Sequence, residues 1–272
     1  MTPSFTRIAV AVALLALTGQ AAPQMAPAQA QPQAGPWIGQ QSAPPDQLLT
    51  SDRPIRGVVE LYTSQGCSSC PPADALLRQY ADSREVIALS FPVDYWDYLG
   101  WKDTLANPRF TARQRAYAKA RGDGAIYTPQ IVVDGTTHVV GSQKGEIDKA
   151  IEDAWPKFQT GRVPVRLWLQ GGATIVETGG APEGATAKEA TIWIAIIDKK
   201  VEVPVRAGEN KGQMLVYTNV VRELVPIGMW IGRPMSVRLA RQAALKPETE
   251  ALAVLIQQGD GGPIIGAAWM GL

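Results

Sequence analysis

Two cysteines, Cys67 and Cys70, are separated by two serines and stand between a β-rich run and a helical pattern. Residues 58–63 (VVELYT) are mostly apolar and β-prone, and residues 73–80 (ADALLRQY) carry apolar side chains at helical spacing. The pattern therefore places Cys67 where a helix begins, at backbone N–H groups that have no partner within the helix and at the positive end of its dipole. Because a thiolate is stabilised there, Cys67 is expected to be a nucleophile at neutral pH.

The Cys-X-X-Cys spacing has three interpretations. A redox dithiol needs a second thiol that can attack a mixed disulfide on the first, and this spacing permits that attack. A purely structural disulfide that closes so short a loop removes little entropy from the unfolded chain. A structural zinc site needs four ligands, whereas the chain has 2 Cys and 1 His; a three-coordinate copper site built from Cys67, Cys70 and His138 is the metal alternative. The redox interpretation implies neither a metal nor an organic cofactor.

The segments around and after the cysteines predict an α/β domain at residues 55–160. Besides the elements named above, they are strands at 86–93, 130–133 and 137–140, a helix between Asn107 and Gly122, and an amphipathic helix at 144–155. Asp134-Gly135 is a hairpin turn signal between the last two strands. Two parallel strands joined by a helix, then a hairpin and a closing helix, form an α/β arrangement with helices on both faces.

Residues 161–272 have a different pattern, made of short alternating runs such as VPVRLWL, ATIWIAII and ALAVLIQQ. Gly, Pro, Asn or Asp stand in most gaps between the runs. Such a series of short strands is typical of an antiparallel β-sandwich. We therefore expect an all-β antiparallel sandwich domain after a boundary near Thr160-Gly161, and residues 208–212 within it have the composition of a simple hairpin loop.

The first residues of the chain predict export. Residues 8–17 are an unbroken apolar run, followed by small residues with cleavage sites after Ala21 or Ala30. The run is shorter than the roughly twenty residues that span a bilayer, so residues 1–30 are typical of a secretory signal peptide. The alternative is an uncleaved signal anchor. Residues 31–54 are rich in Pro and Gln and predict a linker. We expect no membrane span after removal of the signal peptide, and a periplasmic or secreted protein.

The charge balance limits the kinds of partner. The chain has 26 Lys and Arg against 25 Asp and Glu, which leaves a formal net charge of +1. Proteins that bind nucleic acids or anionic membranes carry a basic excess. We therefore expect no nucleic-acid partner.

Three stretches carry a resemblance to known proteins: LYTSQGCSSCPPADALL, VDYWDYLGWKD and YTPQIVVDG. With the order β-α-β-α-β-β-α they resemble the thioredoxin fold and, more closely, an exported bacterial family catalogued as a domain of unknown function, over roughly residues 55–272. That family has a thioredoxin-like domain followed by a β-rich domain. The resemblance implies that Cys67 is the attacking thiol, Cys70 the resolving thiol and Pro129 a cis-proline beside them. No tryptophan precedes Cys67, and no proline or histidine lies between the cysteines, so a redox potential does not carry over.

Strand directions bring several segments to one edge of the expected sheet. If the first two strands are parallel, both end where the helix of Cys67 begins. The strand at 130–133 runs the other way, so Thr128-Pro129 falls at the same edge, and the aromatic segment at 94–101 emerges there as well. The residues expected to bind the substrate at this edge are Thr128, Trp96 and Trp101. The alternative for the two tryptophans is a hydrophobic lid over the core.

Two further ionisable residues stand near these segments. Glu60 lies in the middle of the first strand, close to where thioredoxin-like proteins carry a buried acid, and we expect it to take the proton of Cys70. The alternative is an exposed glutamate on an edge strand. His138 lies in the return strand and is expected to be structural.

These observations predict an exported thiol-disulfide oxidoreductase whose partners are thiol- or disulfide-containing proteins. We expect Cys67 to be the accessible thiol, and Cys70 to be shielded by the sheet. Two other classes remain open. One is a copper-binding or assembly module that uses Cys67, Cys70 and His138, and the other is an interaction protein that retains the fold without turnover.

Overall fold

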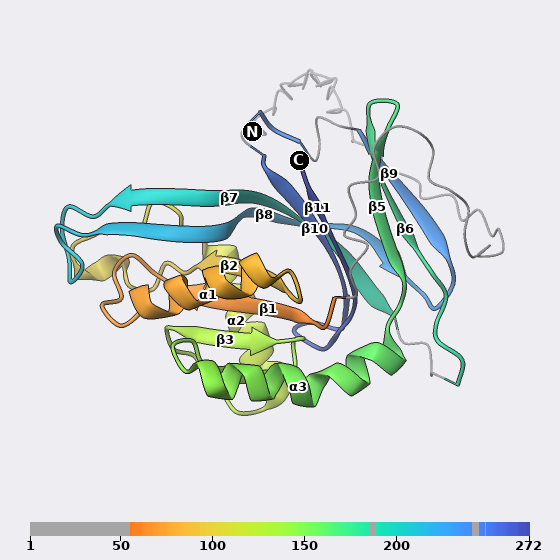
Figure 1. The fold of residues 1–272 in the computed structure, drawn as a ribbon, viewed down its shortest axis with the longest axis horizontal. Coiled ribbons are helices and arrows are strands. Elements are labelled where there is room, and N and C mark those ends of the chain that lie inside the picture. The colour runs from red at the N-terminus through yellow and green to blue at the C-terminus, as the bar shows by residue number, and fades with distance from the viewer. Residues whose placement is uncertain (1–54, 185–188, 241–244, 248) are drawn as a thin grey trace, which may run out of the picture. The chain divides into compact units, whose positions relative to one another are not determined.

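The computed structural model describes residues 55–184, 189–240, 245–247 and 249–272 (Figure 1). Its first elements are β1 (Val58–Thr63), α1 (Pro71–Ser83), β2 (Ile87–Pro92), the 3-10 helix η1 (Asp97–Leu99), α2 (Pro108–Arg121), β3 (Gln130–Val133), β4 (Thr137–Val140) and α3 (Lys144–Gly161). This succession confirms the predicted order of strands and helices. The predicted signal peptide and linker, residues 1–30 and 31–54, lie outside the described residues.

The rest of the chain consists of strands. They are β5 (Val165–Gln170), β6 (Ala173–Thr178), β7 (Ala190–Pro204), β8 (Met214–Trp230), β9 (Met235–Ala240), β10 (Ala251–Gln258) and β11 (Ile264–Gly271). Among the described residues, no helix is long and apolar enough to cross a membrane.

The strands form a mixed eight-stranded sheet and a three-stranded antiparallel sheet. The large sheet has the order β11-β10-β7-β8-β2-β1-β3-β4, and the small one has the order β5-β6-β9. β1 and β2 are parallel, whereas β3 runs antiparallel to β1. As expected, the ends of β1 and β2 and the start of β3 therefore meet at one edge of the large sheet.

The expected sandwich is present only in part. β5, β6 and β9 form a sheet of their own, but β7, β8, β10 and β11 extend the sheet of the first part, as Figure 1 shows. The junction is a parallel pairing of β2 with β8 through Ser90 and Val220. Asn219, in the left-handed region with φ 49°, donates a hydrogen bond from its side chain to the carbonyl of Ala88 at 2.9 Å. The domain boundary near residue 160 stays a prediction, and α3 ends at Gly161.

Helices cover both faces of the β1–β2–β3 region, because β1 is apolar on both sides. Val59 and Leu61 of β1 pack with buried side chains of α1 and α3. Val58 and Tyr62 point the opposite way and pack with α2, in a cluster that also includes residues of β7, β10 and β11. A side chain of β1 therefore packs against α1, the helix that follows the cysteines, only if it lies on the same face as Val59 and Leu61.

Candidate functional site

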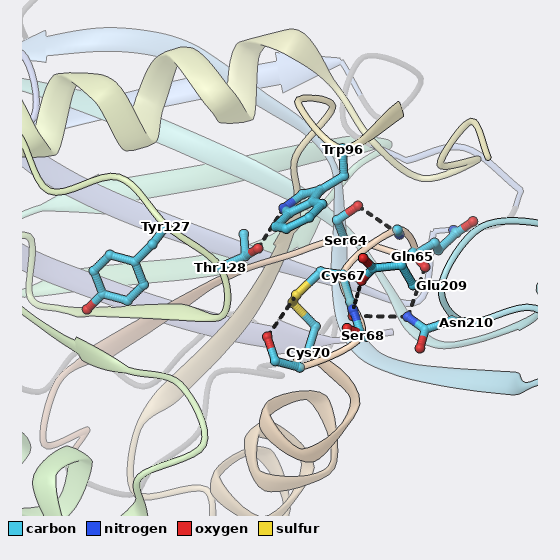
Figure 2. Close-up of a disulfide and its surroundings, with 12 residues drawn as sticks. Ser64, Gln65, Cys67, Ser68, Cys70, Trp96, Tyr127, Thr128, Glu209 and Asn210 are labelled. Atoms are coloured by element: carbon cyan, nitrogen blue, oxygen red, sulfur yellow. Dashed lines mark hydrogen bonds between the residues drawn. A yellow bond between two sulfur atoms is a disulfide. The ribbon is translucent and has the colours of Figure 1, made fainter. Parts of the chain in front are cut away.

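Cys67 and Cys70 form a disulfide at the junction between β1 and α1 (Figure 2). Cys70 is the N-cap of α1, and two prolines follow it, a position that tolerates proline because the first N–H groups of a helix have no intrahelical partner. The N–H of Cys70 donates to the carbonyl of Cys67 at 3.1 Å. The strand–cysteine–helix arrangement predicted from the sequence is confirmed.

The start of α1 offers fewer N–H donors than the sequence argument assumed. Pro71 and Pro72 have none, and the N–H groups of Ala73 and Asp74 both donate to the carbonyl of Cys70. Donors for the sulfur of Cys67 must therefore come from the turn itself. The hydroxyl of Ser69 lies 3.4 Å from this sulfur and is one of them.

Both sulfur-bearing residues are fully buried. The exposed fraction is 0% for Cys67 and 0% for Cys70, whereas Ser68 and Ser69 between them are exposed. The expectation that Cys67 is accessible is wrong for this disulfide form. The physical reason is that residues from other parts of the chain pack onto the turn.

Of the segments that pack onto the turn of the cysteines, the loop between β7 and β8 is the most distant in sequence. Asn210, with an exposed fraction of 1%, donates from its side-chain amide to the carbonyl oxygens of Gln65 at 3.0 Å and of Cys67 at 2.9 Å. The carboxylate of Glu209 accepts a hydrogen bond from the N–H of Ser68 at 3.2 Å. The hairpin loop at 208–212, which the sequence analysis treated as a simple connection, is part of the site.

The two tryptophans expected to bind the substrate both hold segments of this edge together. Trp96 donates from its indole to the hydroxyl of Thr128 at 2.7 Å, and Trp101 donates to the side chain of Gln65 at 2.8 Å. A Cβ on Gly66 would lie 2.9 Å from the Cβ of Trp96, so the residue before Cys67 packs directly on this tryptophan. Figure 2 shows Trp96, Thr128 and the disulfide together.

The peptide bond between Thr128 and Pro129 is cis, as the resemblance predicted. The carbonyl of Pro129 accepts a hydrogen bond from the N–H of Gly141 at 2.9 Å. A Cβ on Gly141 would lie 2.9 Å from a methyl carbon of Leu61 and 3.0 Å from Pro129, so only glycine fits there without a shift of its neighbours.

Glu60 is buried, as expected, but it lies on the α2 face of β1. Its carboxylate accepts hydrogen bonds from Arg113 at 2.7 and 3.0 Å and from the hydroxyl of Tyr62 at 3.0 Å. α1, which begins one residue after Cys70, packs on the other face. The proton-transfer role of Glu60 stays a prediction, and these partners favour a structural role instead.

Asp74, one helical turn after Cys70, is a second buried acid that the sequence analysis missed. Residues four apart on a helix share a face, so the side chains of Asp74 and Cys70 lie on the same side of α1. The exposed fraction of Asp74 is 5%, and within the described residues its Oδ1 has no hydrogen-bond partner. Burial raises the pKa of this carboxyl well above its usual value, and the charge of Asp103 raises it further, whereas the hydroxyl of Thr63 acts in the opposite direction.

The surroundings of Asp74 favour its protonated form. Tyr217 of β8 also has a buried hydroxyl for which the described residues offer no partner; burial, with smaller contributions from the charges of Asp74 and Asp103, raises its pKa. Asp103 itself accepts a hydrogen bond from the N–H of Gln65 at 2.7 Å and so helps to fix the turn before Cys67. A carboxylic acid in this position can give its proton to a neighbouring thiolate, and the carboxylate that this leaves can take a proton back from a thiol. The signal available in the sequence was an acid on the apolar stripe of a helix.

His138 does not join the cysteines. Its Nδ1 lies 2.8 Å from the hydroxyl of Tyr127, and its Nε2 lies 3.3 Å from the carboxylate of Asp123. Burial and the charge of Arg121 lower the pKa of the imidazole against the opposing effect of Asp123. Over the described part of the chain, no three Cys, His, Asp or Glu side chains gather as metal ligands. The geometry therefore gives no support to a copper site built from Cys67, Cys70 and His138.

Comparison with known proteins identifies the family. The family model described as "Protein of unknown function (DUF1223)" matches residues 58–257. The chain belongs to this family. The match includes the disulfide, the Thr128-Pro129 peptide and the loop of Asn210, so the DUF1223 region spans both parts of the site.

One solved structure has a similar fold. The X-ray crystal structure of protein AGR_C_4864 from Agrobacterium tumefaciens is 35% identical in sequence, with a TM-score of 0.71. The alignment covers 81% of this chain and 96% of that one. No curated protein is similar to this chain.

Proposed function

We propose that this DUF1223 protein is an exported thiol-disulfide oxidoreductase that exchanges disulfides through Cys67 and Cys70. The observation that carries the proposal is the Cys67–Cys70 disulfide at the N-terminus of a helix, one turn before a buried carboxyl that has no ion-pair partner among the described residues. Perturbed acids next to nucleophilic side chains are typical of sites that transfer protons. The order β1-α1-β2-α2-β3-β4-α3 supports a thioredoxin-like domain as its framework.

The exchange reaction has two steps. A thiolate of the partner attacks the sulfur of Cys67, the Cys67–Cys70 bond breaks, and Cys70 leaves as a thiolate that takes a proton from Asp74 or from water. A second thiolate of the partner then attacks the partner's sulfur in the mixed disulfide. Cys67 leaves, the partner gains a disulfide, and this protein is reduced by two electrons. The same steps in reverse reduce a disulfide of the partner.

In this proposal, the partner is a thiol- or disulfide-containing protein that approaches the edge formed by Thr128, Trp96 and Trp101. The two indoles hydrogen-bond to Thr128 and Gln65. They therefore shape the edge that a partner would contact. Export to the periplasm or beyond fits an oxidising compartment, where disulfides persist.

Serine variants of the two cysteines test this proposal. The full chain is reduced, mixed with a disulfide-bonded protein substrate, and assayed for released substrate thiols and for trapped mixed disulfides by mass spectrometry. We expect release of substrate thiols by the unchanged chain, accumulation of mixed disulfides with Cys70→Ser, and neither with Cys67→Ser. Trapping by Cys67→Ser instead would reverse the roles of the two thiols, and no exchange by any form would refute the proposal.

The burial of both sulfurs supports a second candidate, an interaction protein that keeps the disulfide only for structure. In that case both serine variants would lose stability to the same extent, and no mixed disulfide would form with either. Thermal unfolding of the two variants beside the trapping assay separates the candidates.

A further inference from the structure

The loop at residues 208–212 rests on the turn that contains the disulfide, although more than a hundred residues separate the two. A Cβ on Gly208 would lie 3.1 Å from the Cβ of Trp101, and this glycine has φ +76°, so both its space and its backbone favour glycine. The next two residues, Glu209 and Asn210, hydrogen-bond to the turn itself. The loop thus contacts Trp101 of the aromatic segment and the turn of the cysteines, and Figure 2 shows Glu209 and Asn210 beside this turn.

We propose that this loop gates thiol exchange: Asn210 is the positioning residue that holds the turn of Cys67 in its closed form, and a partner reacts only after the loop moves away. The inference rests on the proposed function and gives the strand-rich part of the chain a role in it. The exposed fraction of Cys67 is 0% in this structure, in which the loop is hydrogen-bonded to the turn. A nucleophile must approach along the sulfur–sulfur axis, so some part of the cover has to move before it can react.

Asn210 is the residue on which closure depends. Its amide donates to two backbone carbonyls of the turn, those of Gln65 and Cys67. The carbonyl oxygen of Cys67 also accepts a hydrogen bond from the N–H of Cys70, so this one oxygen accepts both from the side chain of Asn210 and from within the turn. Asn210 is 1% exposed, and an amide so fully buried loses stability if its partners leave without replacement by water. Opening the loop therefore exposes these groups to solvent together.

Glu209 connects the gate to the chemistry of the thiol. The N–H of Ser68 is one of the donors of the turn, and in the closed loop it is occupied by the carboxylate of Glu209. A carboxylate next to Cys67 also repels a thiolate there. Departure of the loop removes the negative charge and frees a donor, so the same movement that exposes Cys67 favours its reactive form.

The rate at which a small thiol reduces the disulfide tests the gate. The full chain and its Asn210→Ala and Asn210→Asp variants are mixed with increasing concentrations of 2-mercaptoethanol, and reduction is followed by alkylation and mass spectrometry. Met214→Ala is the matched control, because Met214 begins β8 beside the loop and is 58% exposed. We expect the reduction rate of the unchanged chain to reach a plateau at high thiol concentration, where it equals the rate of loop opening. Loss of the two amide hydrogen bonds in the Asn210 variants should raise that plateau about tenfold. The control should keep the rate of the unchanged chain.

A low concentration of urea separates loop opening from general loss of stability. Opening of a loop exposes little surface, so the plateau should hardly change below the unfolding transition, whereas global unfolding would make it rise steeply. In Glu209→Gln, which keeps an acceptor and removes the charge, alkylation of reduced Cys67 should shift to lower pH. Equal plateaus in the unchanged chain and both Asn210 variants would overturn the gate, as would a steep urea dependence.

These outcomes are distinct from failure of the proposed function. If the gate is wrong and the function right, a protein substrate is still turned over by the unchanged chain, and the Asn210 variants have the same rate. If the function is wrong, the Asn210 variants open and are reduced faster by the small thiol, but none of the forms exchanges disulfides with a protein substrate.

Discussion

Two buried acids on opposite faces of the large sheet have opposite surroundings. Glu60 on the α2 face has its carboxylate paired with Arg113 at 2.7 Å and hydrogen-bonded to Tyr62. For Asp74 on α1, the neighbours that affect the pKa of its carboxyl are Thr63 and Asp103, neither of which is a cation. Its Oδ1 has no hydrogen-bond partner among the described residues. An ion pair between a buried carboxylate and a cation holds elements together, whereas burial without a cation raises the pKa of a carboxyl and favours its protonated form. Burial alone therefore does not distinguish an acid that is held in an ion pair from one that has no cation beside it.

The comparison makes opposite predictions for the neutral variants of the two acids. Glu60→Gln leaves the guanidinium of Arg113 buried without its counter-charge, so we expect a loss of about 3–5 kcal/mol in the free energy of unfolding. Chemical denaturation measures it. Asp82→Asn is the matched control, because its ion pair with Arg78 is exposed and should contribute at most about 0.5 kcal/mol. If Glu60→Gln lost as little unfolding free energy as the control, Glu60 would not stabilise the fold through Arg113.

Asp134 is an intermediate case in which one carboxyl oxygen is held and the other is not. Its Oδ1 accepts from the N–H of Val58 at 2.6 Å, and its Oδ2 has no partner among the described residues. Burial raises the pKa of Asp134 to about 7, although the hydrogen bond from Val58 acts in the opposite direction. The folded protein therefore binds this proton more tightly than the unfolded chain, and the resulting stability is present at low pH and lost as pH rises toward 7.

Asp134→Asn should remove this pH dependence. Between about pH 5 and pH 8, the unchanged chain should lose roughly 3 kcal/mol more unfolding free energy than the variant, at about 1.4 kcal/mol per pH unit over the two units below the shifted pKa. Denaturation curves at both pH values for both proteins give this double difference. A double difference near zero would show that Asp134 is ionised in the folded protein at neutral pH.

Asp74→Asn should stabilise the fold at neutral pH, the opposite of Glu60→Gln. The raised pKa of Asp74 means that stability falls as pH rises above the ordinary value of an aspartate, and asparagine, which does not titrate, escapes this loss. The same variant should slow exchange by roughly a hundredfold, at the low end of general acid–base catalysis, because Cys70 loses its proton partner. Loss of stability together with unchanged exchange would contradict both parts of the comparison.

Thr63→Val is expected to have the smallest effect. The hydroxyl of Thr63 lowers the pKa of Asp74 against the larger effect of burial, so its removal should raise that pKa further. Valine has nearly the same shape as threonine, so the stability should change by less than about 1 kcal/mol. The pH profile of exchange should shift upward. A downward shift would mean that Asp74 is not the group that titrates.

Local patterns predicted the parts of the fold that depend on neighbours in sequence. β1, the Cys-X-X-Cys turn and α1 follow one another within a short stretch, so periodicity and spacing suffice. The meeting of Thr128-Pro129 and the aromatic segment at one sheet edge followed from strand direction. These predictions needed no knowledge of long-range contacts.

Contacts between distant segments explain what the sequence analysis missed. The partner of Glu60 is Arg113, on a helix that covers one of two equally apolar faces of β1, and no pattern states which face. The continuity of the sheet depends on the pairing of Ser90 with Val220, and neither strand shows it in its periodicity. Asn210 lies in a loop whose Gly and Lys residues suit any hairpin, and only its packing against the cysteines gives it a role.

The most direct test of the central claim is the equilibrium of the full chain with glutathione redox buffers. The fraction of oxidised protein is measured by alkylation and mass spectrometry across a range of reduced-to-oxidised glutathione ratios. We expect one two-electron transition, with a mixed disulfide between glutathione and Cys67 trapped in Cys70→Ser. A disulfide that stays intact at every ratio in the unchanged chain and in Asn210→Ala, with no trapped adduct, would contradict a redox role for Cys67 and Cys70.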